Sequence, residues 1–271
     1  EILHRLVGSE MCIRDSTAGV LWGNFRKHKV NVAESKRERD LKMISSSSVQ
    51  SLILESAQDV SKAISKCNDI YLVSINGLAK LNAEDLRKSK KEVSRLGKEI
   101  GKLRNELFYF IQELEEENVK ASHFYISLIS ILEDMAQSLE YITKASYKHV
   151  NNNHRQLKYS QIKELKETQA DLEGLLSDVR FAFDINGYEA FATFADKKEE
   201  LFANIDAKIN QQVQRTRSKE EKSPKNTTLF FGLMVETKDL IVATINLIEH
   251  YHLHYDPTVT PKKLGDEQKD K

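Results

Sequence analysis

The first 223 residues of this 271-residue chain contain no proline, and the whole chain has only 3 Pro and 10 Gly. A sheet protein of this length reverses its chain many times and uses Gly and Pro at its turns. Long stretches without these residues are instead typical of helices. We therefore predict an all-α fold before any local pattern is considered.

Apolar residues recur at steps of three and four through most of the chain, which is the spacing of one face of an α-helix. This pattern predicts six long helices, over residues 49–81, 82–118, 120–150, 160–183, 188–215 and 227–254. Because the connections are short, we expect successive helices to be antiparallel.

The third and sixth predicted helices are the most apolar of the six. A helix that is apolar on most sides lies at the centre of its bundle, so each of these two helices is expected to close a three-helix unit. We predict a bundle of two such units, with halves at about residues 45–150 and 158–254 and a disordered tail at residues 255–271.

Local signals mark the ends of these helices. Asn82 is followed three residues later by Asp85, an arrangement that caps a helix start. Asn151–Asn153 and Asp184–Gly187 predict helix stops, because Asn and Gly adopt left-handed backbone geometry more readily than other residues. Residues 217–226 are predicted to form a charged linker that contains proline.

Two further expectations concern packing inside the bundle. Gly97 and Gly101 lie in the apolar seam of the second predicted helix, where we expect them to allow a neighbouring helix to approach closely. The same helix is basic from Arg87 to Arg104. In the fifth predicted helix, the residues expected to face inward are Phe191, Ala195, Phe202, Ile205 and Ile209.

Opposite charges balance across the chain, with 41 Lys and Arg against 41 Asp and Glu. This balance argues against nucleic-acid binding, which usually relies on a basic field. The two cysteines, Cys12 and Cys67, are too few for a disulfide framework or a four-cysteine zinc site. The sequence contains neither a Gly-rich phosphate loop nor a G-x-S-x-G nucleophile motif, so we do not expect an enzyme.

The beginning of the chain is set apart from this pattern. Residues 1–16, EILHRLVGSEMCIRDS, resemble translated sequencing-adapter read-through and are excluded from the predicted fold. Residues 17–44 form a basic arm, in which Trp22 precedes the stretch Arg26–Lys42 with its net charge of +4. An aromatic residue beside a basic cluster is typical of the cytosolic edge of a membrane segment, and a flexible solvated arm is the alternative. No run in the sequence approaches the roughly 20 apolar residues of a membrane span.

Two segments carry a resemblance to a known family. They are ASHFYISLISILEDMAQSLEYITKASYKHVNNNH, residues 121–154, and SPKNTTLFFGLMVETKDLIVATINLIEHYH, residues 223–252. Both resemble the cytosolic C-terminal region of bacterial inorganic phosphate transporters of the Pit-type family. That region is similar to PhoU, the six-helix regulator of phosphate uptake, and sodium–phosphate cotransporters carry a similar one. The resemblance covers about residues 40–255, and it implies that pore-forming helices precede this fragment and that the basic arm is a juxtamembrane linker.

PhoU proteins typically repeat an acidic motif, in which Glu or Asp is followed four residues later by Asp, and this motif binds metal clusters. The corresponding stretches here are Glu133–Gln137 and Glu236–Leu240, and both lack the second acid. A cluster of hard cations needs several converging carboxylates. We therefore expect neither a bound metal nor another cofactor.

Four residues remain as candidate metal ligands: Glu133, Glu236, His250 and His254. For the two acids the favoured interpretation is interhelical ion pairs, with Lys238, Lys144 or Arg residues of other helices as the cations. For the two histidines it is a helix end, where a protonated His interacts with the helix dipole. His149 and His154 flank the Asn run and are expected to cap the last carbonyls of their helix.

The resemblance implies a soluble cytosolic domain with a regulatory or structural role in an inorganic phosphate transporter of the cell membrane. Its expected partners are its own upstream transmembrane domain and, in a homodimer, a second copy. Symport of inorganic phosphate would belong to the missing membrane part. A free-standing PhoU-type regulator that starts near Met43 is the first alternative. A coiled-coil scaffold built on the seam Val93–Leu114 is the second, although the breaks between helices oppose a continuous rod.

Overall fold

The computed structural model describes residues 49–112 and 119–258, which form six long α-helices with no strand among them. In chain order the elements are α3 (Val49–Ala79), α4 (Ala83–Gln112), α5 (Val119–Asn151), α6 (Tyr159–Ile185), the short 3-10 helix η3 (Tyr188–Ala190), α7 (Phe191–Arg217) and α8 (Pro224–His254). The predicted all-α fold is therefore confirmed for these residues. The segment 1–16, the basic arm 17–44 and most of the predicted tail lie outside the described residues.

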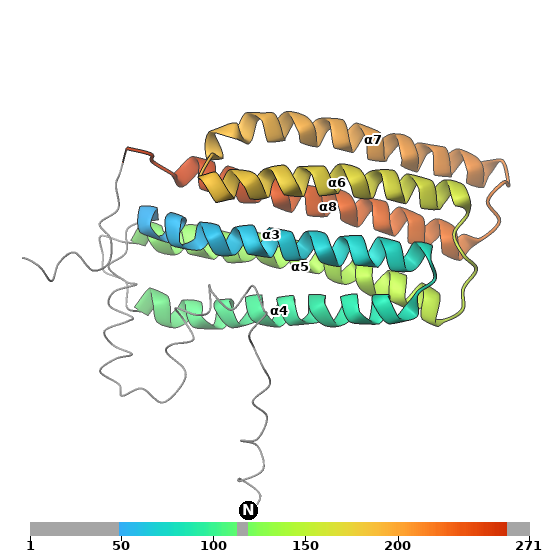
Figure 1. Cartoon of the computed structure of the whole chain (residues 1–271), viewed down its shortest axis with the longest axis horizontal. Helices are drawn as coiled ribbons and strands as arrows, with labels where there is room; N and C mark the ends of the chain where they lie inside the picture. The colour runs from blue at the N-terminus through green and yellow to red at the C-terminus, as the bar shows by residue number, and fades with distance from the viewer. Residues whose placement is uncertain (1–48, 113–118, 259–271) are drawn as a thin grey trace, which may run out of the picture.

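The helices run side by side in layers (Figure 1). α4 forms one outer layer, α3 and α5 form the next, α6 and α8 follow, and α7 forms the opposite outer layer. α5 packs most extensively against α4 and α8, and α3 packs against α6. The two units, α3–α5 and α6–α8, therefore lie face to face and share the interior between them.

The chain reverses direction at residues 80–82, 152–158 and 186–190, and again before α8 (Figure 1). These reversals lay successive helices alongside one another as a bundle. The continuous rod that a coiled-coil scaffold requires is not what the described residues form.

One continuous apolar core joins both units. Tyr251 of α8, which is fully buried, lies where several elements of that core meet. Its ring packs against Phe124 of α5 and Phe183 of α6, with centroid separations of 5.2 and 4.7 Å, and against Tyr188 of η3 at 5.2 Å. Its hydroxyl pairs with Oγ of Ser56 of α3 at 2.6 Å. A single side chain thus contacts helices from both units.

The predicted signals at three helix ends are confirmed. The side-chain oxygen of Asn82 accepts hydrogen bonds from the backbone N–H groups of Glu84 and Asp85, at 3.1 and 3.2 Å, and so caps α4. Asn153 and Asn186, which follow α5 and α6, have φ angles of 53° and 54°. These are the left-handed conformations for which Asn was expected to end a helix.

The predicted linker at residues 217–226 is shorter than expected. α7 continues to Arg217, and α8 begins at Pro224. Oγ of Ser223 accepts a hydrogen bond from the N–H of Asn226 at 3.2 Å and caps the new helix. Proline is well suited to the first helical position, where its missing N–H would have no partner within the helix. Pro224 therefore starts α8 and does not belong to the linker.

The buried face of α7 also differs from the predicted one. Phe194, Leu201 and Ile205 are buried, whereas Phe191 and Phe202 are only partly buried. Of the five residues predicted to face inward, Ile205 alone is fully buried. α7 is an outer helix that contacts both α8 and α6. Which of its faces is buried depends on where those two helices lie, and the spacing of apolar residues along α7 does not specify this.

The expectation that Gly97 and Gly101 allow a close helix approach is wrong. A Cβ placed on either residue would meet no heavy atom within 4 Å. Both glycines line a groove of about 370 Å³ between α4 and α5. Open space, and not a neighbouring backbone, therefore lies over them.

We expect Gly97→Ala to raise the free energy of unfolding by about 0.5–1 kcal/mol, because alanine favours the helix and has room for its methyl group. Urea denaturation followed by helical circular dichroism measures this change. Gly77→Ala is the matched control, since its Cβ would lie 2.9 Å from Cγ of the buried Leu86 and is expected to destabilise the bundle. A Gly97→Ala protein less stable than the wild type would contradict the open groove.

Candidate functional site

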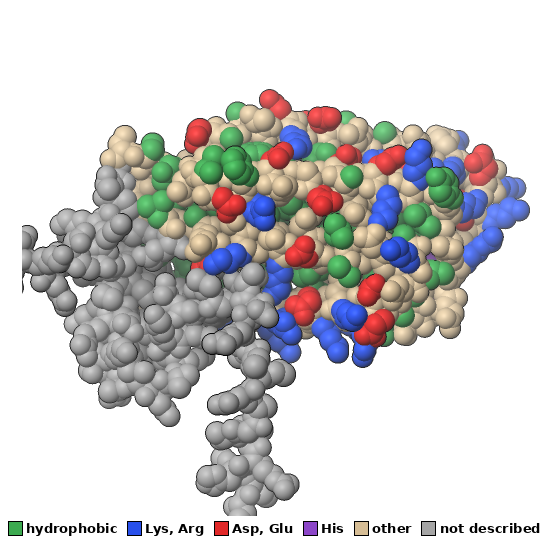
Figure 2. All heavy atoms as spheres, viewed as in Figure 1, with side chains coloured by type: hydrophobic (Ala, Val, Ile, Leu, Met, Phe, Trp, Pro, Cys, Tyr) green, Lys and Arg blue, Asp and Glu red, His purple; other side chains and the backbone are tan. Residues whose placement is uncertain are grey.

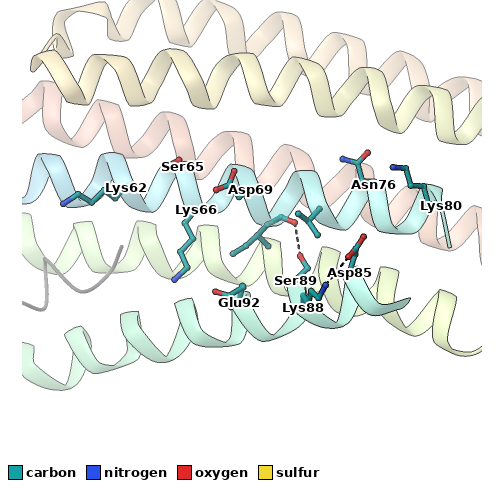
Figure 3. Close-up of a pocket in the computed structure, with 12 residues that line it drawn as sticks. Lys62, Ser65, Lys66, Asp69, Asn76, Lys80, Asp85, Lys88, Ser89 and Glu92 are labelled. Atoms are coloured by element: carbon teal, nitrogen blue, oxygen red, sulfur yellow. Dashed lines mark hydrogen bonds and ion pairs between the residues drawn. The ribbon is translucent and has the colours of Figure 1, made fainter. Parts of the chain in front are cut away.

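A groove of about 650 Å³ lies between α3 and α4 (Figure 3). It stays open because α4 packs more extensively on α5 than on α3. Ile70 and Val73 of α3 give it apolar walls. At its base, Oγ of Ser89 donates to the carbonyl of Ile70 at 3.0 Å and pairs with Oγ of Ser74 at 2.8 Å. These bonds tie α4 to α3 beneath the groove.

Charged side chains of both signs line the rim of this groove (Figure 3). Lys66 of α3 reaches Glu99 of α4, with 3.5 Å between Nζ and Oε2, and the two side chains are only 13% and 15% exposed. Lys88 pairs with Asp85 on its own helix at 3.8 Å. Because many of the rim charges are paired, the groove suits an elongated segment with apolar residues and charged flanks better than a free anion.

One end of the groove is more positive than the rest. There Lys80 and Asn76 line the rim, and Lys166 of α6 donates from Nζ to the side-chain oxygen of Asn76. Burial and the nearby charge of Lys80 lower the pKa of Lys166. A carboxylate on a bound segment would find its most favourable position at this end.

A second groove, of about 530 Å³, lies between α5 and α8 and is lined by Asp134, Glu236 and Asp239. Burial and the neighbouring Asp239 raise the pKa of Glu236, and a hydrogen bond with Ser138 acts in the opposite direction. Within the described part of the chain, no ion pair neutralises these three carboxylates. This groove is therefore an acidic surface of the bundle.

The expected ion pairs form for one of the two candidate acids. Glu133 pairs with Arg104 of α4 at 3.2 Å, as predicted for an interhelical pair. Lys144 and Lys238, the cations expected near the acids, instead pair with Glu140 and with an aspartate of α7. The prediction is thus confirmed for Glu133, whose partner is an Arg of another helix, and it is wrong for the two lysines.

The structure does not bring the four candidate metal ligands together. Glu133 faces α4, Glu236 lies in the acidic groove, and His250 and His254 lie at the end of α8. Among residues 49–112 and 119–258, no three His, Cys, Asp or Glu side chains lie close enough to hold one metal ion.

The two histidines of α8 contact backbone carbonyls. Nε2 of His250 lies 2.8 Å from the carbonyl oxygen of Phe124, and its ring stacks on that of Phe124 at 4.5 Å. Nδ1 of His254 lies 2.8 Å from the carbonyl oxygen of His250. His254 therefore satisfies a carbonyl in the last turn of α8, in keeping with the predicted helix-end role. That prediction is wrong for His250, which contacts a carbonyl of α5.

His149 has a different role from the predicted one. It is buried, and its Nε2 hydrogen-bonds with the carbonyl of Arg155 at 2.9 Å. Arg155 lies in the connection after α5, so His149 holds this connection and does not cap a carbonyl of its own helix. The ring of His154 packs edge-on against that of His149 at 5.3 Å.

We expect the free energy of unfolding to fall as the pH drops below about 6.5. Burial lowers the pKa of both His149 and His250 below their ordinary value of 6.5. The unfolded chain therefore binds protons at a pH where the folded protein keeps both rings neutral, and acidification favours unfolding. Urea midpoints between about pH 7 and about pH 5 measure this dependence.

His250→Gln provides the control for this pH dependence. Glutamine can still donate to the carbonyl of Phe124 but does not titrate, so its urea midpoint is expected to vary less with pH. An identical pH dependence in the variant and the wild type would refute the role of His250.

The sequence does not mark the polar contacts at the end of the bundle away from Tyr251. Gln156 links the two units there, and Glu164 joins α6 to α7 within one unit. The side chain of Gln156 donates to the carbonyl of Ala79 at 3.1 Å, and its own carbonyl accepts from Asn226 at 3.0 Å. Glu164 binds Arg215 through two hydrogen bonds, of 2.7 and 2.6 Å. These partners are far apart in sequence, and no local pattern marks them.

Comparisons of the chain with family models, with curated proteins and with solved structures return no match. Among the described helices, none combines the length and the apolar character of a membrane span. The class that the described residues define is an all-α bundle of six long helices.

Proposed function

We propose that this chain is the cytosolic regulatory domain of an inorganic phosphate transporter, separated from the membrane part that carries phosphate. The main support is the position of the two segments that resemble such transporters, because residues 121–154 and 223–252 coincide with α5 and α8. These helices are the third members of the two units and pack against each other. The resemblance thus falls on the central helices of the bundle and not on scattered surface positions.

In this proposal the bundle influences transport through contacts with the membrane part or with a second copy of itself. The groove between α3 and α4 is the surface best suited to such a contact. Its apolar walls and its charged rim fit a cytosolic segment that carries both apolar and charged residues. Translocation of phosphate itself would be carried out by the membrane part.

Recovery of the natural coding sequence upstream of Thr17 tests this proposal. We expect it to encode several runs of about 20 apolar residues, each long enough to cross a membrane. A start codon close to Thr17, with no such runs before it, would overturn the transporter proposal and favour a free-standing PhoU-type regulator.

A further inference from the structure

The outer helix α4 carries a concentration of positive charge that the neutral total conceals. Between residues 87 and 104 it has two acids, Glu92 and Glu99, and eight Lys or Arg: Arg87, Lys88, Lys90, Lys91, Arg95, Lys98, Lys102 and Arg104. All eight basic side chains are exposed. Figure 2 shows Lys and Arg gathered along the lower edge of the molecule, over α4.

Three of these lysines form a stripe along the helix. Lys91, Lys98 and Lys102 are separated by seven and four residues, which places them on one face over a length of about 16 Å. The buried residues of α4, such as Val93 and Ile100, occupy the opposite face. The stripe therefore points away from the bundle.

The lysines of the stripe differ from the other cations of α4. Arg87, Lys88 and Arg95 pair with acids of their own helix, and Arg104 pairs with an acid of α5. Within the described residues, no acidic side chain pairs with a lysine of the stripe. Their charge is therefore available to an external partner.

Exposed aromatic side chains continue the helix beyond the stripe. Phe108 and Tyr109, near the end of α4, are 62% and 50% exposed. Tyr109 lies seven residues after Lys102, on the face that carries the stripe. Aromatic residues beside basic residues are characteristic of surfaces that meet the headgroup region of a membrane.

We propose that α4 is a docking surface for an anionic lipid membrane, with the lysine stripe against the headgroups and Phe108 and Tyr109 at the interface. Charge complementarity selects this occupant, since no acid of the described residues pairs with the stripe and the helix continues to exposed aromatic rings. A surface that lies flat along one helix also fits the plane of a bilayer. The proposal stands on the charges of α4 and does not require that a transporter be attached.

Co-sedimentation of the full chain with lipid vesicles tests this assignment. We expect binding to vesicles of phosphatidylcholine that contain about 30 mol% phosphatidylglycerol. Binding to vesicles of phosphatidylcholine alone should be much weaker. Each basic residue near such a surface strengthens binding about fivefold, so replacing Lys91, Lys98 and Lys102 by Gln is expected to weaken it on the order of 100-fold. Circular dichroism confirms that the variant keeps its helices.

The matched control replaces three exposed lysines of the other unit, Lys163, Lys222 and Lys225, by Gln. This variant should bind the anionic vesicles within about twofold of the wild type, since these lysines lie outside α4. The basic arm is retained in every protein, so its contribution is the same throughout. Unchanged binding by the α4 variant, equal losses in both variants, or failure of the wild type to prefer anionic vesicles would each overturn the assignment.

Discussion

Replacing Tyr251 by alanine is expected to lower the free energy of unfolding by about 3–5 kcal/mol. The side chain is fully buried and contacts Phe124, Phe183 and Tyr188, which belong to three different elements of the core. Its loss leaves a cavity that the surrounding helices fill only in part. Because one core serves both units, we expect a single unfolding transition at a lower urea concentration.

Tyr251→Phe is the matched control, because it keeps the ring and removes only the hydroxyl. Oγ of Ser56, the partner of that hydroxyl, also donates to the carbonyl of Leu52 at 2.5 Å and so keeps one hydrogen bond. The expected loss is about 1 kcal/mol. Similar losses for the alanine and phenylalanine variants, or two separate transitions in the wild type, would contradict a core shared by both units.

Glu164→Ala is expected to lower the free energy of unfolding by about 3–5 kcal/mol. Glu164 is 7% exposed and makes two short hydrogen bonds to the guanidinium of Arg215. The hydrogen bond with Glu164 raises the pKa of Arg215. Without it, the ordinary pKa of a guanidinium is still far above neutral, so Arg215 remains charged when the carboxylate is removed. Leaving the largely buried guanidinium of Arg215 without its carboxylate lowers the stability of the folded state. Guanidinium chloride denaturation measures the change in the free energy of unfolding.

The double variant Glu164→Met with Arg215→Met distinguishes the effect of an unpaired charge from the effect of lost side-chain packing. It removes both charges and replaces them with apolar side chains of similar length, so we expect a stability within about 1.5 kcal/mol of the wild type. If the double variant were as unstable as Glu164→Ala, the large effect would come from lost packing and not from an unpaired charge.

Much of the architecture could be predicted from the sequence, because helix periodicity and caps are local. The start of α3 at Val49 and the end of α8 at His254 coincide with the predicted limits. Asn153 and Asn186 end their helices as expected, because the preference of Asn for left-handed geometry does not depend on distant residues. Pro224 is an exception, because proline suits both a loop and the first turn of a helix and the sequence alone does not decide between them.

The surfaces of the bundle were harder to predict, because they depend on how helices rotate against each other. Gly97 and Gly101 lie among regularly spaced apolar residues in the sequence, yet in the structure each one borders open space. The partners of Glu133 and Lys238 lie on the preceding helix, α4 and α7 respectively, and no local pattern identifies them. The basic character of α4 is visible in the sequence, but the exposure of its charges follows from the position of α4 as an outer helix.

The initial rate of phosphate uptake tests the central claim most directly. Cells would express either the natural gene with its upstream sequence or the same gene ended before Val49, with equal membrane insertion verified for both. Our account predicts that both proteins carry phosphate and that their rates differ by a factor on the order of five or more, the range of typical regulatory coupling. Equal rates from two correctly inserted proteins would contradict a regulatory role for the bundle.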